Sequence, residues 1–386
     1  MTNPKLPEYL MYRKIIRLLL LMLGLWPIEK SSVFYTILPY IQLILNVITA
    51  LAMLGFVRVH ITNIALVTKC ASIMVSYFTG TLKMVCMIIY REDTRTLHKN
   101  LDPHFSELLN KAELKNSILQ GVTAFRRLSW AVSLLVLLSG TVYIVAPIIF
   151  IVYQRTHQVA NIKYLLPYAA KYPWAIAPNG LLYKLHYVFE SCATVSLIAI
   201  TSSVDPLYTL YVFQMIGQLR ELTHEMSQLS EKVNSQIVIR KCVNQYAVLM
   251  KCRDILQRIY GPLILWMILS NAMILCAGLF QLSQLKRISI GQIILFSAYV
   301  STKMTQTFLC GWAGTRLTTE SENYTRAVYA ADWVGKKELM SSILIMLTQK
   351  PLVLTAYGFS VISVQIFSTV LNTTVSYYFL LQTLQA

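Results

Sequence analysis

Seven long apolar stretches dominate this chain and limit what it can fold into. A helix needs roughly 20 mostly apolar residues to cross a bilayer core about 30 Å thick. The charged fraction is 13%, about half of what a soluble domain carries, and no stretch shows the short alternating pattern of a transmembrane β-strand. The sequence therefore predicts an all-α integral membrane protein with seven transmembrane helices. The predicted spans are residues 36–57, 64–90, 129–153, 185–216, 260–285, 288–311 and 351–384.

Basic residues are distributed unequally between the two sets of connecting segments. The N-terminal segment and segments 91–128, 217–259 and 312–350 together hold 24 Lys and Arg residues, whereas the alternate loops hold seven. Cytoplasmic loops carry the excess of Lys and Arg. We therefore expect a cytoplasmic N-terminus and an extracellular C-terminus. The net charge of +17 is interpreted as this topology signal and not as a nucleic-acid surface.

No repeat, low-complexity tract or flexible linker interrupts the chain, so residues 1–386 are predicted to form one domain. Residues 1–35 are its cytoplasmic and interfacial N-terminal part, in which the run Leu18–Trp26 is predicted to lie along the membrane surface. Residues 36–350 contain the first six spans, with a pocket and cytoplasmic helices. The last part is the final span, at residues 351–386.

The segments between the later spans have helical periodicity of their own. Apolar residues recur at helical spacing in 217–259 and 312–350, so these segments are predicted to extend spans 4, 5 and 6 and to pack together outside the membrane. The stretch Lys336–Gln349 is predicted to be a short amphipathic helix that Pro351 ends.

Motifs of catalysis are missing from the sequence. It has no P-loop, no GxSxG elbow, no GxGxxG and no HExxH. We therefore predict no catalytic residue, no metal site and no cofactor, and the chain is not expected to be an enzyme.

The last span carries an uncharged polar face. Its polar side chains are spaced in steps of three and four, which places them on one side of a helix. This pattern has two explanations: hydrogen bonding between helices, or a water-filled pore shared between subunits. The residues of this face are Gln365, Thr369, Asn372, Ser376, Leu380 and Thr383.

A second group of residues lies in the predicted outer halves of spans 2, 3, 4 and 6. Aromatic residues with few hydroxyl groups and one glycine are typical of an apolar small-molecule pocket, although ordinary helix packing gives the same pattern. The candidate pocket residues are Met74, Tyr77, Phe78, Val136, Ser139, Gly140, Tyr143, Phe189, Ala193, Phe296, Tyr299 and Val300.

Five charged residues lie within predicted spans, where each needs a partner or water. Pairing of Asp205 with Lys83 or Lys303 is one interpretation, and a direct role with a ligand or ion is the other. The five are Lys69, Lys83, Glu190, Asp205 and Lys303.

Several motifs resemble insect odorant receptors over essentially the whole chain. They are LGLWP at Leu23–Pro27, LPY to KYPW at Leu166–Trp174, AVYAADW at Ala327–Trp333, LTQKPLVLTA at Leu347–Ala356 and VSYYFLLQTL at Val375–Leu384. The resemblance implies a subunit of a tetrameric, odorant-gated, non-selective cation channel in the plasma membrane of olfactory sensory neurons. It also implies a shared co-receptor subunit, whose long cytoplasmic insertion and characteristic tail this chain lacks, so this chain is similar to the ligand-selective subunits.

The same resemblance assigns roles to residues. The last span would line the pore, Leu380 would occupy the apolar gate, and Gln382 and Thr383 would lie just beyond it. Small volatile odorants would bind in the outer half of each subunit, where Tyr77, Phe78 and Tyr299 match best. The alternative is a seven-helix receptor that signals through a soluble transducer, which the inverted topology disfavours.

Overall fold

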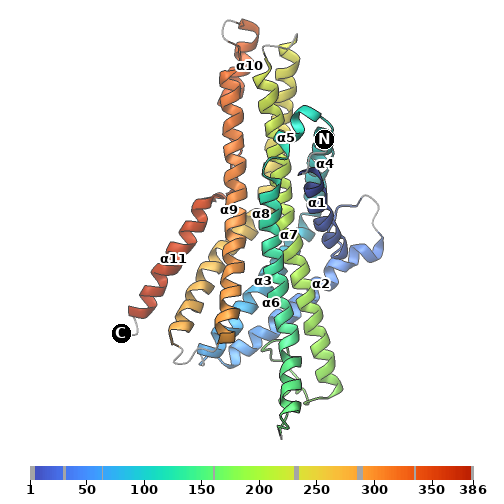
Figure 1. Cartoon of the computed structure of the whole chain (residues 1–386), viewed down its shortest axis with the longest axis vertical. Coiled ribbons are helices and arrows are strands. Elements are labelled where there is room, and N and C mark those ends of the chain that lie inside the picture. Colours follow the sequence, from blue (N-terminus) through green and yellow to red (C-terminus); the bar gives the residue numbers. More distant parts are fainter. Residues whose placement is uncertain are drawn as a thin grey trace.

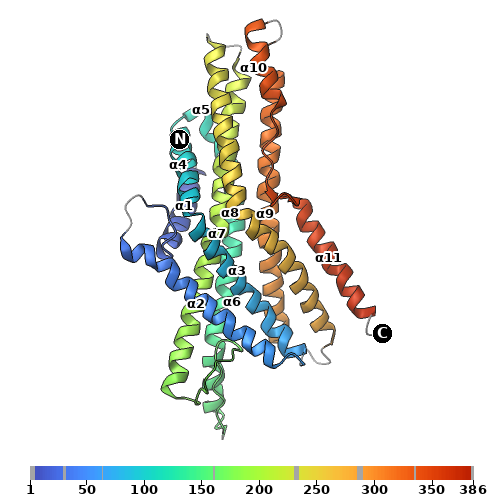
Figure 2. The same ribbon diagram turned by 180° about the vertical axis from the view of Figure 1, so that it is seen from behind.

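The structure is a computed structural model that describes residues 5–28, 32–62, 64–159, 161–229, 234–284, 290–333 and 336–383. These residues form a helical bundle with one short β-hairpin, as predicted for the fold class (Figures 1 and 2). The helices are α1 (Lys5–Met22), α2 (Val33–Val59), α3 (Ile64–Ile89), α4 (Arg91–Leu108), α5 (Ala112–Ile118), α6 (Val122–Thr156), α7 (Leu181–Ser227), α8 (Ser235–Gln284), α9 (Ile290–Ala330), α10 (Lys337–Thr348) and α11 (Val364–Thr383). The strands are β1 (Thr355–Ala356) and β2 (Ser360–Val361).

Helices α7, α8 and α9 are the longest and form the frame of the bundle (Figure 1). They contain predicted spans 4, 5 and 6 and continue past them toward α10. Their extensions pack together, as the sequence predicted: Arg220 on α7 forms an ion pair of 2.6 Å with Glu320 on α9. The rings of Tyr246 on α8 and Tyr324 on α9 stack with their centroids 5.1 Å apart. The short helix α10 also lies where it was predicted.

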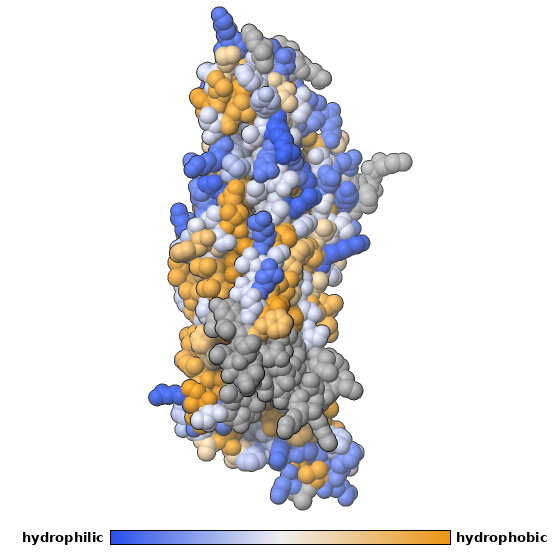
Figure 3. Space-filling model, turned by 90° about the vertical axis from the view of Figure 1, so that its left-hand side faces the viewer, coloured by the Kyte–Doolittle hydropathy of each residue, from blue (hydrophilic) through white to orange (hydrophobic). Residues whose placement is uncertain are grey.

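Four described helices have both the length and the apolar composition to cross a membrane: Val33–Val59, Cys70–Ile89, Val122–Thr156 and Leu181–Ser227. These correspond to predicted spans 1 to 4. Predicted spans 5 to 7 coincide with parts of α8, α9 and α11, whose apolar stretches include side chains outside the described residues. Apolar side chains gather over the middle and lower part of one face, and hydrophilic ones over its two ends (Figure 3).

The segment before α11 corrects the predicted boundary of the last span. Residues 351–363 are not helical, because a hairpin turn intervenes at Tyr357 and Gly358, which both have positive φ angles (54° and 76°). The two strands pair antiparallel, and the amide of Ile362 donates to the carbonyl oxygen of Leu354 at 2.8 Å. The last helix therefore begins at Val364, thirteen residues later than the apolar stretch begins.

The hairpin places α11 halfway along α9, from which it diverges toward the C-terminus (Figures 1 and 2). Two glycines of α9 allow this close approach. A Cβ at Gly314 would lie 2.2 Å from the carbonyl oxygen of Ile362, and one at Gly311 would lie 2.4 Å from that of Ser363. A side chain at either position would displace the start of α11.

Helix α1 begins well before the predicted interfacial run Leu18–Trp26 and ends within it, at Met22. Its inner face is buried: the Tyr12 hydroxyl contacts the Thr209 hydroxyl on α7 at 2.6 Å. Tyr9 packs on Phe105 of α4 and Phe213 of α7, with ring centroids 4.9 and 6.0 Å away. Its outer face exposes apolar side chains, including Leu18 at 57%, as expected of a helix that lies against the membrane surface.

Candidate functional site

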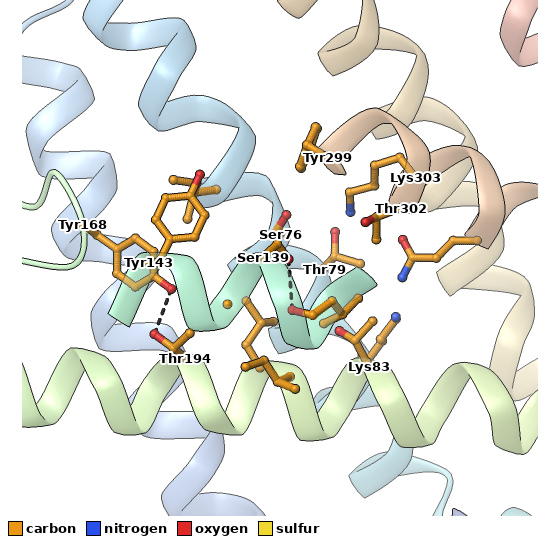
Figure 4. A pocket seen from close by; sticks show the side chains of 17 residues that line it. Ser76, Thr79, Lys83, Ser139, Tyr143, Tyr168, Thr194, Tyr299, Thr302 and Lys303 are labelled. Atoms are coloured by element: carbon orange, nitrogen blue, oxygen red, sulfur yellow. Dashed lines mark hydrogen bonds between the residues drawn. The ribbon is translucent and has the colours of Figure 1, made fainter. Parts of the chain in front are cut away.

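A cavity of about 100 Å³ lies among α3, α6, α7 and α9, with Tyr168 of the α6–α7 loop at one end (Figure 4). An engineered cavity of about 150 Å³ in another protein holds benzene, so this cavity has room for a molecule of a few heavy atoms. Its lining residues are Ile73, Ser76, Thr79 and Lys83 of α3; Val136, Ser139, Gly140 and Tyr143 of α6; Tyr168; Thr194, Leu197, Ile198 and Thr201 of α7; and Tyr299, Thr302, Lys303 and Gln306 of α9.

The cavity contains five of the twelve candidate pocket residues. These are Val136, Ser139, Gly140, Tyr143 and Tyr299. On α6 all four candidates line it, since their spacing of three and four residues places them on one face of the helix.

The candidates on α3 and α7 lie away from the cavity. On α3 the inward residues are Ile73 and Ser76 and not their neighbours Met74 and Tyr77. A shift of one residue turns the face of a helix by about 100°, so the predicted face was rotated by that amount. The outlying candidates are Met74, Tyr77, Phe78, Phe189, Ala193 and Val300, whereas the side chain of Phe296 lies outside the described residues.

Tyrosines close one end of the cavity. The Tyr168 hydroxyl lies 2.8 Å from the Thr194 hydroxyl, and its ring is 5.4 Å from those of both Tyr77 and Tyr143. Tyr77 therefore supports this wall from behind. Pocket periodicity did not predict Tyr168, although its loop carries the LPY motif at Leu166–Tyr168.

Glu190 holds this loop in place. Its carboxylate accepts hydrogen bonds from the amide of Tyr168 at 3.1 Å and from the hydroxyl of Tyr172 at 2.9 Å. A buried carboxylate is stable only with such partners. The intramembrane glutamate thus has a structural function, as an anchor for the loop that closes the cavity.

Charged and amide side chains form the opposite end of the cavity. The Nζ atom of Lys83 lies 2.7 Å from the carboxylate of Asp205, which confirms one of the two expected pairings. Gln306 donates to the same carboxylate at 3.0 Å. Lys303 lies beside them, with its ammonium 5.6 Å from the ring centroid of Tyr299. The side chain of Lys69 lies outside the described residues.

Three further cavity residues, all on α9, could have been predicted from the sequence. Thr302, Lys303 and Gln306 follow Tyr299 at steps of three, four and seven residues, so they share its face of the helix. Extending the aromatic pattern by one turn would have joined the candidate pocket to the intramembrane lysine.

Helix α11 leaves its uncharged polar face uncovered by the described part of the chain. Gln365, Thr369, Asn372 and Ser376 are all exposed. The opposite face packs on α8 and α9 through Ile366, Val370 and Thr374, which are buried. The side chains of Leu380, Gln382 and Thr383 lie outside the described residues.

Among the described residues, no group of three or more His, Cys, Asp or Glu side chains is arranged to hold a metal ion. The arrangement is that of a small, partly aromatic cavity with a cationic end, one of whose helices, α9, also contacts α11 with its exposed polar face.

Comparison with known proteins gives concordant matches. The sequence model of the 7tm odorant receptor family matches residues 63–375. Odorant receptor 13a of Drosophila melanogaster is 20% identical over 395 residues, which cover 93% of this chain and 92% of that protein. Odorant receptor 82a of the same species is 22% identical over 365 residues, with coverage of 90% and 92%.

Among solved structures, that of the insect olfactory receptor OR5 from Machilis hrabei in complex with eugenol superimposes with a TM-score of 0.81. The alignment covers 98% of this chain and 100% of that chain at 16% identity. The seven-helix membrane fold is therefore shared between the two proteins.

Proposed function

This chain belongs to the 7tm odorant receptor family, and we propose that it is a subunit of a channel that a small volatile odorant opens to cations. Members of this family are membrane receptors and not enzymes. In the proposal, the odorant occupies the cavity among α3, α6, α7 and α9, and α11 lines a pore shared with co-receptor subunits. The site of action is the plasma membrane of olfactory sensory neurons.

The observation that carries the pore assignment is the exposed polar face of α11. Four uncharged polar side chains, Gln365, Thr369, Asn372 and Ser376, lie on this face. The Thr369 hydroxyl donates to the carbonyl oxygen of Gln365 at 2.9 Å, but exposure to lipid would leave the side-chain amides of Gln365 and Asn372 without partners among the described residues, at a cost in free energy. Water in a shared pore supplies those partners, and neighbouring subunits complete the walls.

Helix α9 connects the cavity to the proposed pore helix. It carries Tyr299 and Lys303 on the cavity, and about two turns further on its Gly311 touches the start of α11. The Phe308 and Phe367 rings of the two helices lie 5.6 Å apart. A ligand that favours one position of α9 would therefore favour one position of α11.

The proposed site consists of the cavity residues and the tyrosine wall. Tyr143, Tyr168 and Tyr299 would contact the odorant, and Tyr77 would support Tyr168. On α11, Leu380 would form the constriction, with Gln382 and Thr383 beyond it, as the family resemblance implies. The complex of OR5 with eugenol supports a small-molecule ligand of this kind.

The experiment is whole-cell recording from cells that express the chain with and without the co-receptor, under a panel of volatile odorants. The proposal requires odorant-evoked cation currents. Asn372→Asp should then shift the reversal potentials in mixed cation solutions, because a charge in the pore acts on every passing ion. The matched control Asn161→Asp adds the same charge in the exposed α6–α7 loop and should leave them unchanged.

Chains that reach the surface but give no odorant-evoked current in either expression condition would contradict the proposed function. Currents whose selectivity is the same for Asn372→Asp and Asn161→Asp would remove α11 from the pore.

A further inference from the structure

Lys303 is a buried cation without an ionic partner in the described part of the chain. Its exposed fraction is 7%, and its side chain lines the cavity (Figure 4). None of the ion pairs among the described residues includes it, and its one assigned contact is the face of the Tyr299 ring. An ammonium within a membrane-spanning region normally has a counterion or water.

The neighbouring carboxylate, that of Asp205, already has two other partners. The Asp205 carboxylate lies 2.7 Å from the ammonium nitrogen of Lys83, and it accepts a hydrogen bond from the side-chain amide of Gln306 at 3.0 Å. Two lysines thus lie near one carboxylate at this end of the cavity, and only Lys83 forms an ion pair with it. The attraction between opposite charges is much stronger in this buried region than at a solvated surface.

Four of the hydroxyl groups around the cavity do not compete with Lys303 as donors. Those of Ser76, Thr79, Ser139 and Thr302 donate to carbonyl oxygens one turn back in their own helices, at distances from 2.8 to 3.1 Å. Their protons are therefore engaged, and lone pairs remain on the cavity side. The ammonium of Lys303 brings three N–H donors and a positive charge to the cavity, whereas the hydroxyl groups of Tyr143 and Thr201 bring only neutral donors.

We propose that the cavity selects small carboxylates, with the ligand carboxylate bound to the ammonium of Lys303 and its short apolar tail between Tyr143 and Tyr299. This inference rests on the proposed function and names the ligand class of the same cavity. A carboxylate neutralises the unpaired charge, whereas a neutral carbonyl group accepts a hydrogen bond and leaves the charge in place. The volume of about 100 Å³ restricts the tail to a few carbon atoms.

The experiment uses three probes with equal numbers of heavy atoms: butanoate, the neutral ester methyl propanoate, and hexane. Each is applied at neutral pH to cells that express the chain with the co-receptor, and the concentration for half-maximal current is measured. Butanoate should act at the lowest concentration. If hexane or methyl propanoate acts at an equal or lower concentration, the inference is overturned whatever the variants do.

Variants then assign the preference to one side chain. Lys303→Met has a similar length without the charge and should weaken butanoate about tenfold to a hundredfold, while hexane is little affected. Lys303→Arg keeps the charge and should retain most of the preference. Thr305→Met is the matched control, since Thr305 is partly exposed on the same helix and does not line the cavity.

An unchanged butanoate response in Lys303→Met, or equal losses for all three probes, would overturn the inference. The odorant panel separates this failure from that of the proposed function. Panel odorants that open the channel without any carboxylate preference refute only the ligand class, whereas no response to any odorant refutes the channel.

Discussion

A buried basic side chain in each half of the molecule has a different electrostatic environment. In the half toward α10, Arg220 pairs with Glu320 and also donates to the carbonyl oxygens of Ser117 and Gln120 at 2.9 and 2.7 Å. In the half toward the α6–α7 loop, Lys303 lies beside a cavity with its ionic partner missing from the described residues. Arg220 is thus fully paired within a packed half, whereas Lys303 lies beside a cavity without an ion pair among the described residues.

Packing of aromatic side chains follows the same division. Toward α10, Tyr9, Phe105, Phe125 and Phe213 fill the space among α1, α4, α6 and α7, with ring centroids 4.9 to 6.0 Å apart. Around the cavity, the tyrosines form a wall with open space on one side. Together with the proposed function, this difference predicts that substitutions in the two halves separate effects on stability from effects on ligand response.

The largest effect is expected from breaking the Arg220–Glu320 pair. Glu320→Ala leaves a buried guanidinium without its carboxylate and should destabilise the fold by about 3–5 kcal/mol. Thermal unfolding of the purified receptor in detergent measures this. The exposed pair of Lys336 with Asp332, at 2.9 Å, is the control: Asp332→Ala should cost less than about 1 kcal/mol. Equal losses of stability in Glu320→Ala and Asp332→Ala would mean that the buried ion pair stabilises the fold no more than the exposed one.

Acid should weaken the packed half through Glu221. Burial alone would raise the pKa of this carboxyl, but hydrogen bonds from His104 and Lys111 at 2.8 and 2.9 Å outweigh it and lower the pKa from 4.5 to about 2. Folding therefore favours the charged form of Glu221. Its contribution to the free energy of unfolding is complete above about pH 4.5 and is lost as the pH falls toward 2. The contribution is of the order of 3 kcal/mol.

The measurement is the difference in melting temperature between the wild-type protein and Glu221→Gln as a function of pH. It should be largest near neutral pH and shrink through that acidic window. A difference that stays constant down to pH 2 would show that the carboxylate is not stabilised by its partners.

Smaller effects, on response and not on stability, are expected in the hollow half. Tyr143→Ala and Tyr299→Ala remove cavity walls and should each cost about 1–3 kcal/mol of ligand binding, a tenfold to hundredfold loss of potency. Tyr77→Ala, behind Tyr168, should cost less. Dose–response curves at matched surface expression measure this. Tyr246→Ala, in the packed half, is the control. It should lower surface expression, but the protein that reaches the surface should keep the wild-type dose–response curve.

The sequence predicted the packed half better than the hollow half. Apolar periodicity located the helical extensions and α10, because packed helices need a continuous apolar stripe. It missed the start of α11, since the Tyr357–Gly358 turn and the hairpin pairing depend on contacts with Leu354 and Ile362 that hydropathy does not encode.

The cavity illustrates a different limit. Periodicity shows which residues share a face, but not whether that face meets a neighbour or a void. On α6 the aromatic and small residues identified the cavity face, whereas on α3 a face rotated by one residue carried more aromatics. The polar residues that continue the α9 pattern, Thr302, Lys303 and Gln306, were the unused signal.

A structure of the receptor with its co-receptor at a saturating agonist concentration tests the central claim most directly. The account predicts ligand density in the hollow half, between Tyr143 and Lys303. The competing location is the apolar groove of about 420 Å³ among α1, α6 and α7, lined in part by Trp130 and Leu134. Density confined to that groove, with the cavity empty, would contradict the division between a packed half and a ligand-binding half.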